Sequence, residues 1–360
     1  MNRPLDIAIV STPWFQLPPA AYGGIESMCA DLVDGLVELG HKVTVIGVGL
    51  NGTKADFIAT DTMPRGDTRL GRAGPEVLHA ARAAQVLRTL QPDIIHDHST
   101  AGPLQAGQRP VPTVVTAHGP VSGELGDYYQ ALAGSVSLVA ISRAQQEQAP
   151  GLPWAGQVHN AVRTLDHPYR ERKGDRVAFL GRIAAEKGVH LAIDAARRAG
   201  KAITIAGKCN DPDEEPYFRN EVLPRLGEDA EWVGELDQAA KRELLAEAQC
   251  LLFPICWEEP FGMVMIEAMA CGTPVVALRR GSVPEIVDHG VTGFVCDDPA
   301  ELPDAIRNVS RLSPRDCRAR VLDRFDTSRM AAAYASLYEE LAGQRTDRAL
   351  RRDSLGRRRT

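Results

Sequence analysis

Short aliphatic segments alternate with segments of helical periodicity along almost the whole sequence. Near-continuous aliphatic strands that alternate with helices are typical of parallel sheets with helices on both faces. The pattern therefore predicts an α/β fold. The strand-like segments lie at 5–11, 42–48, 93–96, 112–117, 136–141, 176–181, 202–206, 230–233, 250–254 and 274–278.

The alternation is interrupted by one polar and charged segment, RTLDHPYRERKG at 163–174, which is typical of a linker. A chain of 360 residues is long enough for two domains of about 150 residues each. We therefore expect two tandem doubly wound Rossmann-like domains with a cleft between them, followed by an amphipathic helix at about 328–342. The expected parts are residues 1–165, residues 166–325, a helical segment at 326–343 and a disordered Arg-rich tail at 344–360.

Composition excludes several classes of protein. Hydrophobic residues make up 44% and charged residues 24% of the chain, as in globular proteins. The net charge of −6 argues against a nucleic-acid partner. The seven cysteines form no CxxC pair, so a disulfide framework and a zinc ribbon are not expected. Without a signal-peptide pattern or an apolar stretch of about 18 residues, the sequence predicts a soluble, cytoplasmic protein.

Glycines, cations and carboxylates follow many of the predicted strands. Because ligands of open α/β sheets bind beyond the carboxyl ends of the strands, these residues are candidates for one site in the cleft. Together they suit a polyanion that carries hydroxyl groups. They include Gly23, Gly24, Asp97, His98, His118, Arg182, Lys187, Glu259 and Gly262.

Arg182 and Lys187 form a pair of cations near a predicted helix start. A cation is unfavourable at a helix N-terminus unless an anion is bound there, so the pair indicates a phosphate site. The alternative is two surface cations. His118 ends a buried strand beside Gly119, where it can contact substrate or bond to the backbone.

Glu267 falls on an apolar stripe of the helix predicted to begin near Phe261. A buried carboxylate costs several kcal/mol unless it has a partner, and a vicinal diol such as a ribose supplies two O–H donors. The alternative is an ion pair with an internal Arg or Lys. Glu259 precedes this helix, and Gly262 lets backbone amides approach a ligand.

A metal site is not expected. His96 and His98 share one face of a strand, but third and fourth ligands are not evident, so we place Asp97 and His98 at an acceptor-side strand end. The Asp-x-Asp pattern at Asp211 and Asp213 lies in a polar insertion and receives little weight.

Two helix starts show a capping-box pattern. Ser142 and Gln145 form the first, and Ser282 and Glu285 form the second. The pattern predicts a structural role for Glu285.

Several motifs resemble those of the retaining family-4 glycosyltransferases of the GT-B fold, over about residues 5–340. EPFGMVMIEAMACGTPVVA at 259–277 resembles the family signature and holds Glu259 and Glu267 at its E-x7-E spacing. GRIAAEKGV at 181–189 resembles the phosphate-binding segment. YGGIE, IIHDHS, TAHGP and GVTGFVCDD occur in the family's order. The first two are most similar to a bacterial subgroup that includes an avilamycin-type enzyme.

The resemblance implies a nucleotide-diphosphate-sugar donor bound mainly by the C-terminal domain. Arg182 and Lys187 match the contacts to the diphosphate. Glu259 matches the contact to the sugar hydroxyls, and Glu267 matches the contact to the ribose. The neighbouring residues expected to complete the donor site are Phe261, Gly262 and Met263.

On the N-terminal side, Gly23 and Gly24 match the loop that closes on the diphosphate, and His118 matches a histidine near the reacting sugar. The resemblance implies retention of the anomeric configuration, a front-face mechanism, no metal and no other cofactor. It also implies a terminal helix that crosses back to the first domain. The expected catalytic residues are His118, Arg182, Lys187 and Glu259.

The sequence departs from the family at one motif and leaves other functions open. Asn160 is followed by Ala161 where the family has Gly, so the local turn is expected to differ.

The expected acceptor is a small molecule, a glycan or a lipid-linked molecule, and the Arg-rich tail allows a peripheral membrane contact. The alternatives are a sugar-nucleotide epimerase or hydrolase of the same fold, and a non-catalytic sugar-binding protein.

Overall fold

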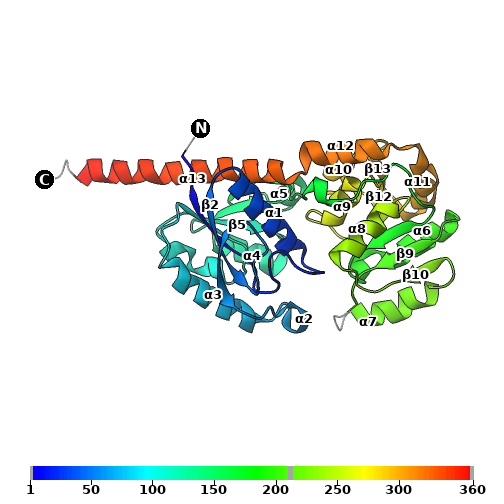
Figure 1. The fold of residues 1–360 in the computed structure, drawn as a ribbon, viewed down its shortest axis with the longest axis horizontal. Helices are drawn as coiled ribbons and strands as arrows, with labels where there is room; N and C mark the ends of the chain where they lie inside the picture. The colour runs from blue at the N-terminus through cyan, green and yellow to red at the C-terminus, as the bar shows by residue number, and fades with distance from the viewer. Residues whose placement is uncertain (1–2, 210–213, 357–360) are drawn as a thin grey trace.

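The computed structural model describes residues 3–209 and 214–356. Two lobes lie side by side, and each contains one parallel sheet covered by helices (Figure 1). This arrangement confirms the predicted α/β fold with two Rossmann-like sheets. Within the described part of the chain, no helix is both long and apolar enough to cross a membrane.

The N-terminal sheet has seven strands in the order β3-β2-β1-β4-β5-β6-β7. Its central strands are mostly buried and largely aliphatic, as the sequence predicts. The strands are β1 (Asp6–Val10), β2 (Lys42–Val48), β3 (Asp56–Asp61), β4 (Ile94–Asp97), β5 (Thr113–Ala117), β6 (Ser137–Ala140) and β7 (Trp154–Gln157), and the α-helices are α1 (Gly24–Glu38), α2 (Gly66–Arg69), α3 (Ala73–Leu87), α4 (Gly123–Ala131) and α5 (Arg143–Gln148).

The C-terminal sheet has six strands in the order β10-β9-β8-β11-β12-β13. Its strands are β8 (Val177–Leu180), β9 (Ile203–Ala206), β10 (Ala230–Trp232), β11 (Leu251–Phe253), β12 (Val275–Leu278) and β13 (Gly293–Cys296). Its α-helices are α6 (Val189–Arg198), α7 (Glu214–Tyr217), α8 (Gln238–Glu247), α9 (Met263–Ala270), α10 (Val283–Ile286), α11 (Leu302–Asn308) and α12 (Pro314–Arg324).

The sequence analysis missed three strands, β3, β7 and β13. All three lie at the edges of the sheets, where a strand pairs on one side only. Most positions of β3 and β7 are partly exposed, so their sequences lack an unbroken aliphatic run.

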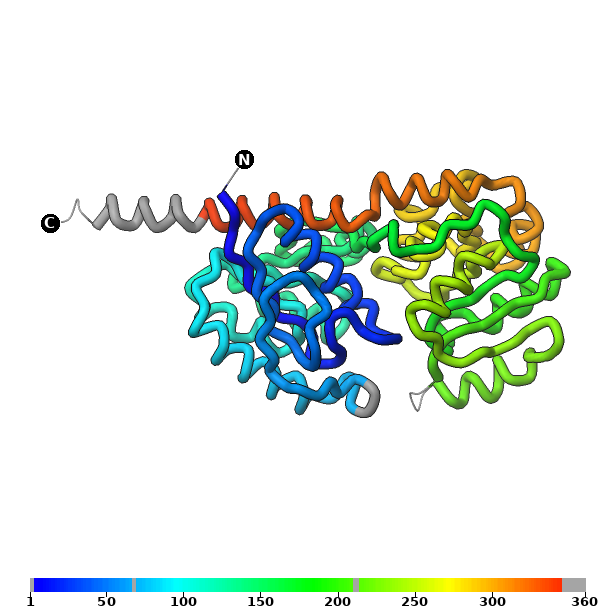
Figure 2. The backbone as a smooth tube through the Cα atoms, viewed as in Figure 1, coloured from blue at the N-terminus to red at the C-terminus, as the bar shows by residue number. Residues whose placement is uncertain are grey.

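The chain passes between the lobes twice, and the two crossings lie beside each other (Figure 2). Val162 N donates to Phe325 O at 3.0 Å, and Thr327 N donates to Val162 O at 3.2 Å. The second crossing leads into α13 (Thr327–Gly356), which returns along the N-terminal lobe and packs against α1 (Figure 1). A Cβ on Gly35 of α1 would lie 2.7 Å from the Ala331 Cβ of α13, so this close approach requires glycine.

The terminal helix is longer than the sequence analysis predicts. The expected helix ends near residue 342, whereas the backbone of α13 is helical to Gly356. The tail expected at 344–360 therefore begins within the range of α13, and its disorder stays a prediction. Residues 357–360 lie outside the described residues.

Candidate active site

A cavity of about 360 Å³ lies between the lobes at the carboxyl ends of both sheets. A smaller hollow of about 190 Å³ adjoins it and shares Tyr22, Gly24, Arg182 and Met263 with it. Together they bring all of the predicted donor-site residues to one place. The predicted residues that line one or both are Gly23, Gly24, His118, Arg182, Lys187, Glu259, Phe261, Gly262, Met263 and Glu267.

Two glycines shape the cavity walls. Gly262 adopts φ 79° at the N-terminus of α9, where a Cβ would lie 2.8 Å from Met265 Cε. Gly23 adopts φ 139° just before α1, where a Cβ would lie 2.9 Å from Pro19 Cβ. Residues that carry a side chain rarely adopt such backbone angles, and a Cβ would lie too close to its neighbours at both positions. Glycine therefore allows these two loops to take their conformation beside the cavity.

Lys187 and Glu259 form an ion pair in the cavity. Lys187 Nζ donates to Glu259 Oε2 at 2.6 Å, and Trp257 Nε1 donates to the same oxygen at 3.0 Å. The ammonium also lies 5.2 Å from the centre of the Trp257 ring. These contacts fix the positions of a cation and a carboxylate that the sequence analysis assigned to neighbouring parts of the donor.

Arg182 is held by two carboxylates that the sequence analysis did not assign. It donates to Glu214 Oε1 at 2.7 Å and to Glu186 Oε1 at 2.8 Å. Burial lowers the pKa of Arg182, but the bond to Glu214 and the nearby negative charges outweigh it and raise the pKa overall. The guanidinium is therefore charged and oriented at the cavity.

Glu267 pairs with an internal cation, the alternative left open above. Lys241 Nζ of α8 donates to Glu267 Oε1 at 2.7 Å. Burial raises the pKa of Glu267, but the charge and hydrogen bond of Lys241 outweigh it and lower the pKa overall. Both side chains line the smaller hollow, so the paired carboxylate still borders the space between the lobes.

Three histidines form a cluster that reaches the cavity through one of its members. His118 lines the cavity, and its Nε2 lies 2.9 Å from His98 Nδ1. The ring of His98 lies 3.9 Å from the ring of His96, which bonds to Thr116 and to Tyr338 of α13. Burial lowers the pKa of His118 to about 4, so its ring is neutral at pH 7.

Asn160 is a lining residue that the sequence analysis did not assign. Its side chain is buried, and its Oδ1 accepts no hydrogen bond from any described residue. In the sequence, Asn160 stood out only because Ala161 follows it where the family has Gly.

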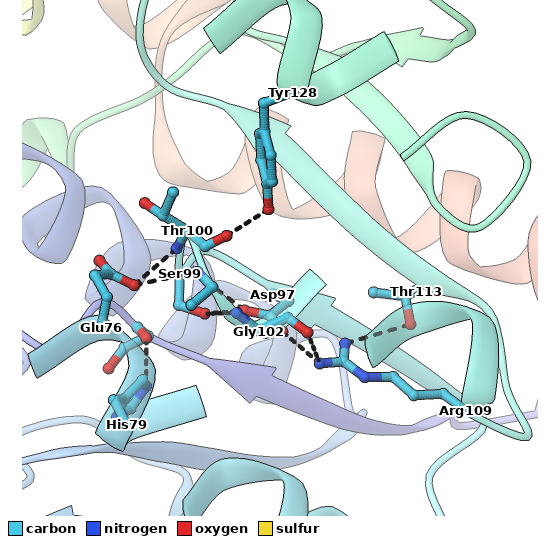
Figure 3. A network of polar contacts seen from close by, with 11 residues as sticks. Glu76, His79, Asp97, Ser99, Thr100, Gly102, Arg109, Thr113 and Tyr128 are labelled. Carbon is cyan, nitrogen blue, oxygen red and sulfur yellow. Dashed lines mark hydrogen bonds and ion pairs between the residues drawn. The ribbon is translucent and has the colours of Figure 1, made fainter. Parts of the chain in front are cut away.

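Asp97 is fully buried and belongs to a network inside the N-terminal lobe (Figure 3). Arg109 donates to Asp97 Oδ2 at 2.7 Å and to Gly102 O at 2.8 Å. Ser99 Oγ also donates to the Asp97 carboxylate, at 2.7 Å. Asp97 and His98 line neither of the two hollows, and Asp97 instead bonds within the loop after β4.

Glu285 does not form the predicted capping box with Ser282. Ser282 Oγ donates to Phe261 O instead, at 2.7 Å. The Glu285 carboxylate reaches across to the N-terminal lobe and accepts from Ala144 N at 2.6 Å and from Arg143 N at 3.0 Å. It therefore caps α5 of the other lobe, and His159 Nε2 lies 3.2 Å from its Oε2.

The loop before α1 also meets the C-terminal lobe. Gln238 Nε2 donates to Ala21 O at 2.9 Å, and Lys208 Nζ lies 3.8 Å from the centre of the Tyr22 ring. These contacts hold the Gly23–Gly24 turn over the smaller hollow.

The part of the chain that the structure describes contains no group of three or more His, Cys, Asp or Glu able to hold a metal ion. Asp211 and Asp213 lie outside the described residues.

Both lobes match known families. Residues 22–173 match "Glycosyltransferase Family 4", and residues 174–311 match "Glycosyl transferases group 1". A glycogen synthase of Mycobacterium tuberculosis is 29% identical over 404 residues, covering 94% of this chain and 96% of the relative.

Solved structures share the architecture. AviGT4, a glycosyltransferase involved in avilamycin A biosynthesis, is 25% identical with a TM-score of 0.73, covering 94% of this chain and 98% of that one. HepE of Anabaena, in complex with UDP and glucose, is 20% identical with a TM-score of 0.73, covering 94% and 100%. Matches on both lobes, and relatives aligned over nearly their whole length, show that the chain is a glycosyltransferase of family 4 with the GT-B fold.

Proposed function

We propose that the protein transfers a sugar from a nucleotide-diphosphate-sugar donor to an acceptor hydroxyl, with retention of configuration and without a metal. The observation that carries the proposal is the meeting of Arg182, Lys187, Glu259 and Glu267 around two adjoining hollows between the lobes. Two cations suit a diphosphate, and the two carboxylates suit hydroxyl groups on either side of it.

In this proposal the diphosphate lies near Arg182 and Lys187. Negative charge builds on the leaving phosphate as the bond to the sugar breaks, and fixed cations stabilise that charge. Glu259 orients Lys187 and accepts from sugar hydroxyls. Glu267 accepts from the ribose diol, and Lys241 keeps it ionised.

The acceptor hydroxyl attacks from the face that the diphosphate leaves, which gives retention. Its proton passes to the departing phosphate oxygen, so no protein base is required. His118, with its low pKa, is neutral at pH 7 and acts here as a hydrogen-bonding group toward the sugar, not as an acid.

The relatives support a transferase over the epimerase or hydrolase alternative. The M. tuberculosis relative is named as a synthase, and HepE carries UDP and glucose in its structure. Both descriptions fit a site for a nucleotide and a sugar in the interlobe cavity.

A donor screen tests the proposal. Thermal shift with UDP-, GDP-, ADP- and dTDP-sugars is expected to show stabilisation by one nucleotide class, because a ligand that binds only the folded state raises Tm. Product analysis by proton NMR then distinguishes transfer with retention from donor turnover alone. Stabilisation by none of the four donor classes, or an inverted product, would contradict the proposal.

A further inference from the structure

We propose that His98 is a positioning residue that fixes His118 as its Nδ1–H tautomer and so presents a hydrogen-bond donor to the cavity. This inference deepens the proposed function, on which its consequence for activity rests. It starts from the contact of 2.9 Å between His98 Nδ1 and His118 Nε2.

Both rings are neutral, so each carries one ring proton. Burial, followed by the nearby rings of His96 and His118, lowers the pKa of His98 well below its ordinary value. Burial likewise lowers the pKa of His118 to about 4. A single proton therefore lies between the two facing nitrogens, and either His98 or His118 donates it.

The other nitrogen of His98 decides between the two arrangements. His98 Nε2 is buried and has no hydrogen-bond partner among the described residues. If His118 donated, His98 would carry its own proton on Nε2, leaving a buried N–H without an acceptor. If His98 donates, its Nε2 is instead a bare acceptor. Among buried backbone groups, under-satisfied acceptors are less rare than orphaned N–H groups, and we apply the same preference to the imidazole.

The second arrangement sets the chemistry of His118. Its Nε2 accepts from His98, so its own proton lies on Nδ1. His118 lines the cavity, and no described residue hydrogen-bonds to that Nδ1. The cavity therefore receives a neutral N–H donor, which suits a ligand oxygen.

The surroundings hold both rings in place. Gln145 is fully buried, and its Nε2 donates to Ala117 O and to Gly119 O at 2.8 Å each, on either side of His118. The ring of His98 packs against the ring of His96 at a tilt of 39°, and His96 Nδ1 lies 2.6 Å from Tyr338 Oη of α13. The backbone of His118 and the plane of His98 are thus both restrained.

Histidine-selective nitrogen-15 NMR of the full-length, ligand-free protein tests the tautomer directly. Free neutral histidine favours the Nε2–H form, so an Nδ1–H signal pattern for His118 is a specific expectation. The signals of His118 are assigned by their loss in His118→Gln. An Nε2–H pattern for His118 in the wild type would overturn the inference, whatever the activity.

Two substitutions separate positioning from packing. His98→Leu removes the donor and is expected to return His118 to the Nε2–H form and to lower kcat about tenfold. His98→Asn places an amide N–H near the position of Nδ1 and is expected to keep the Nδ1–H form and most of kcat. His41→Asn, at the opposite end of the sheet, is the matched control.

The outcomes also distinguish this inference from the proposed function. An Nδ1–H pattern in a protein that turns over no nucleotide sugar supports the inference and contradicts the function. Retention of the Nδ1–H form in His98→Leu shows that His98 does not cause it. If His98→Leu fails to fold, the wild-type tautomer and the His98→Asn variant still decide.

Discussion

Lys187 Nζ lies 2.6 Å from Glu259 Oε2, so a cation suited to phosphate and a carboxylate suited to sugar hydroxyls form one ion pair in the cavity. Each group orients the other, and Trp257 bonds to the same carboxylate oxygen. Arg182 is likewise paired with Glu214, and Glu267 is paired with Lys241. The charged groups of the site are thus held in place by protein partners.

Glu267→Ala is expected to weaken nucleotide binding by roughly 1–3 kcal/mol, because charged hydrogen bonds to the ribose are lost. Calorimetric titration with free nucleotide and with nucleotide sugar should give similar losses, since both carry the ribose. Glu243→Ala, an exposed change on the same helix as Lys241, is the control. Unchanged affinity in a folded Glu267→Ala variant would show that this carboxylate does not bind the nucleotide.

The sequence predicted the parts of this site that depend on local spacing. Glu259 lies just before α9 and Glu267 lies on that helix, and Gly262 between them supplies the backbone conformation that the helix start needs. The ends of the predicted strands likewise placed His118 and Arg182 at the carboxyl edges of their respective sheets. These features follow from local periodicity and from the topology of parallel sheets.

The partners of these residues could not be predicted, because they depend on packing between distant segments. Lys241 comes from another helix than Glu267, and Glu285 caps a helix that lies 141 residues earlier in the chain. Asp97 and His98 are adjacent in sequence, yet Asp97 bonds to Arg109 inside the lobe and His98 turns toward His118. Which partner each side chain takes depends on its burial in the folded protein, and the sequence pattern does not show that burial.

Glu285→Gln is expected to lower Tm at pH 7 by about 2–4 °C, because the amide caps α5 less well than a carboxylate. Burial raises the pKa of Glu285, but the bonds from His159, Ala144 and Arg143 outweigh it and lower the pKa overall. The carboxylate therefore stabilises the fold above the ordinary Glu pKa, and this stabilisation is lost as pH falls through the lowered value.

Thermal denaturation between pH 7 and pH 3.5 measures this contribution. The difference in Tm between wild type and Glu285→Gln should shrink toward the acid end. The exposed Glu147→Gln serves as the control at each pH. A difference that stays constant with pH would mean that the ionised carboxylate of Glu285 is not what stabilises the contact.

Transferase activity is expected to survive excess EDTA. In the proposed mechanism, Arg182 and Lys187 supply the positive charge that a divalent ion would otherwise supply at the diphosphate. Initial rates are measured with and without the chelator. Complete loss of activity that Mn²⁺ or Mg²⁺ restores would contradict this expectation.

Steady-state kinetics of Lys187→Ala and Arg182→Ala test the central claim most directly, that the two cations stabilise the leaving diphosphate. Each substitution is expected to lower kcat by about 10²–10³ while donor KM rises less, because the interaction strengthens in the transition state. Arg197→Ala, which removes an exposed surface pair, should leave kcat unchanged. Wild-type kcat with only a raised donor KM in both cation variants would contradict the account, since the pair would then only dock the donor.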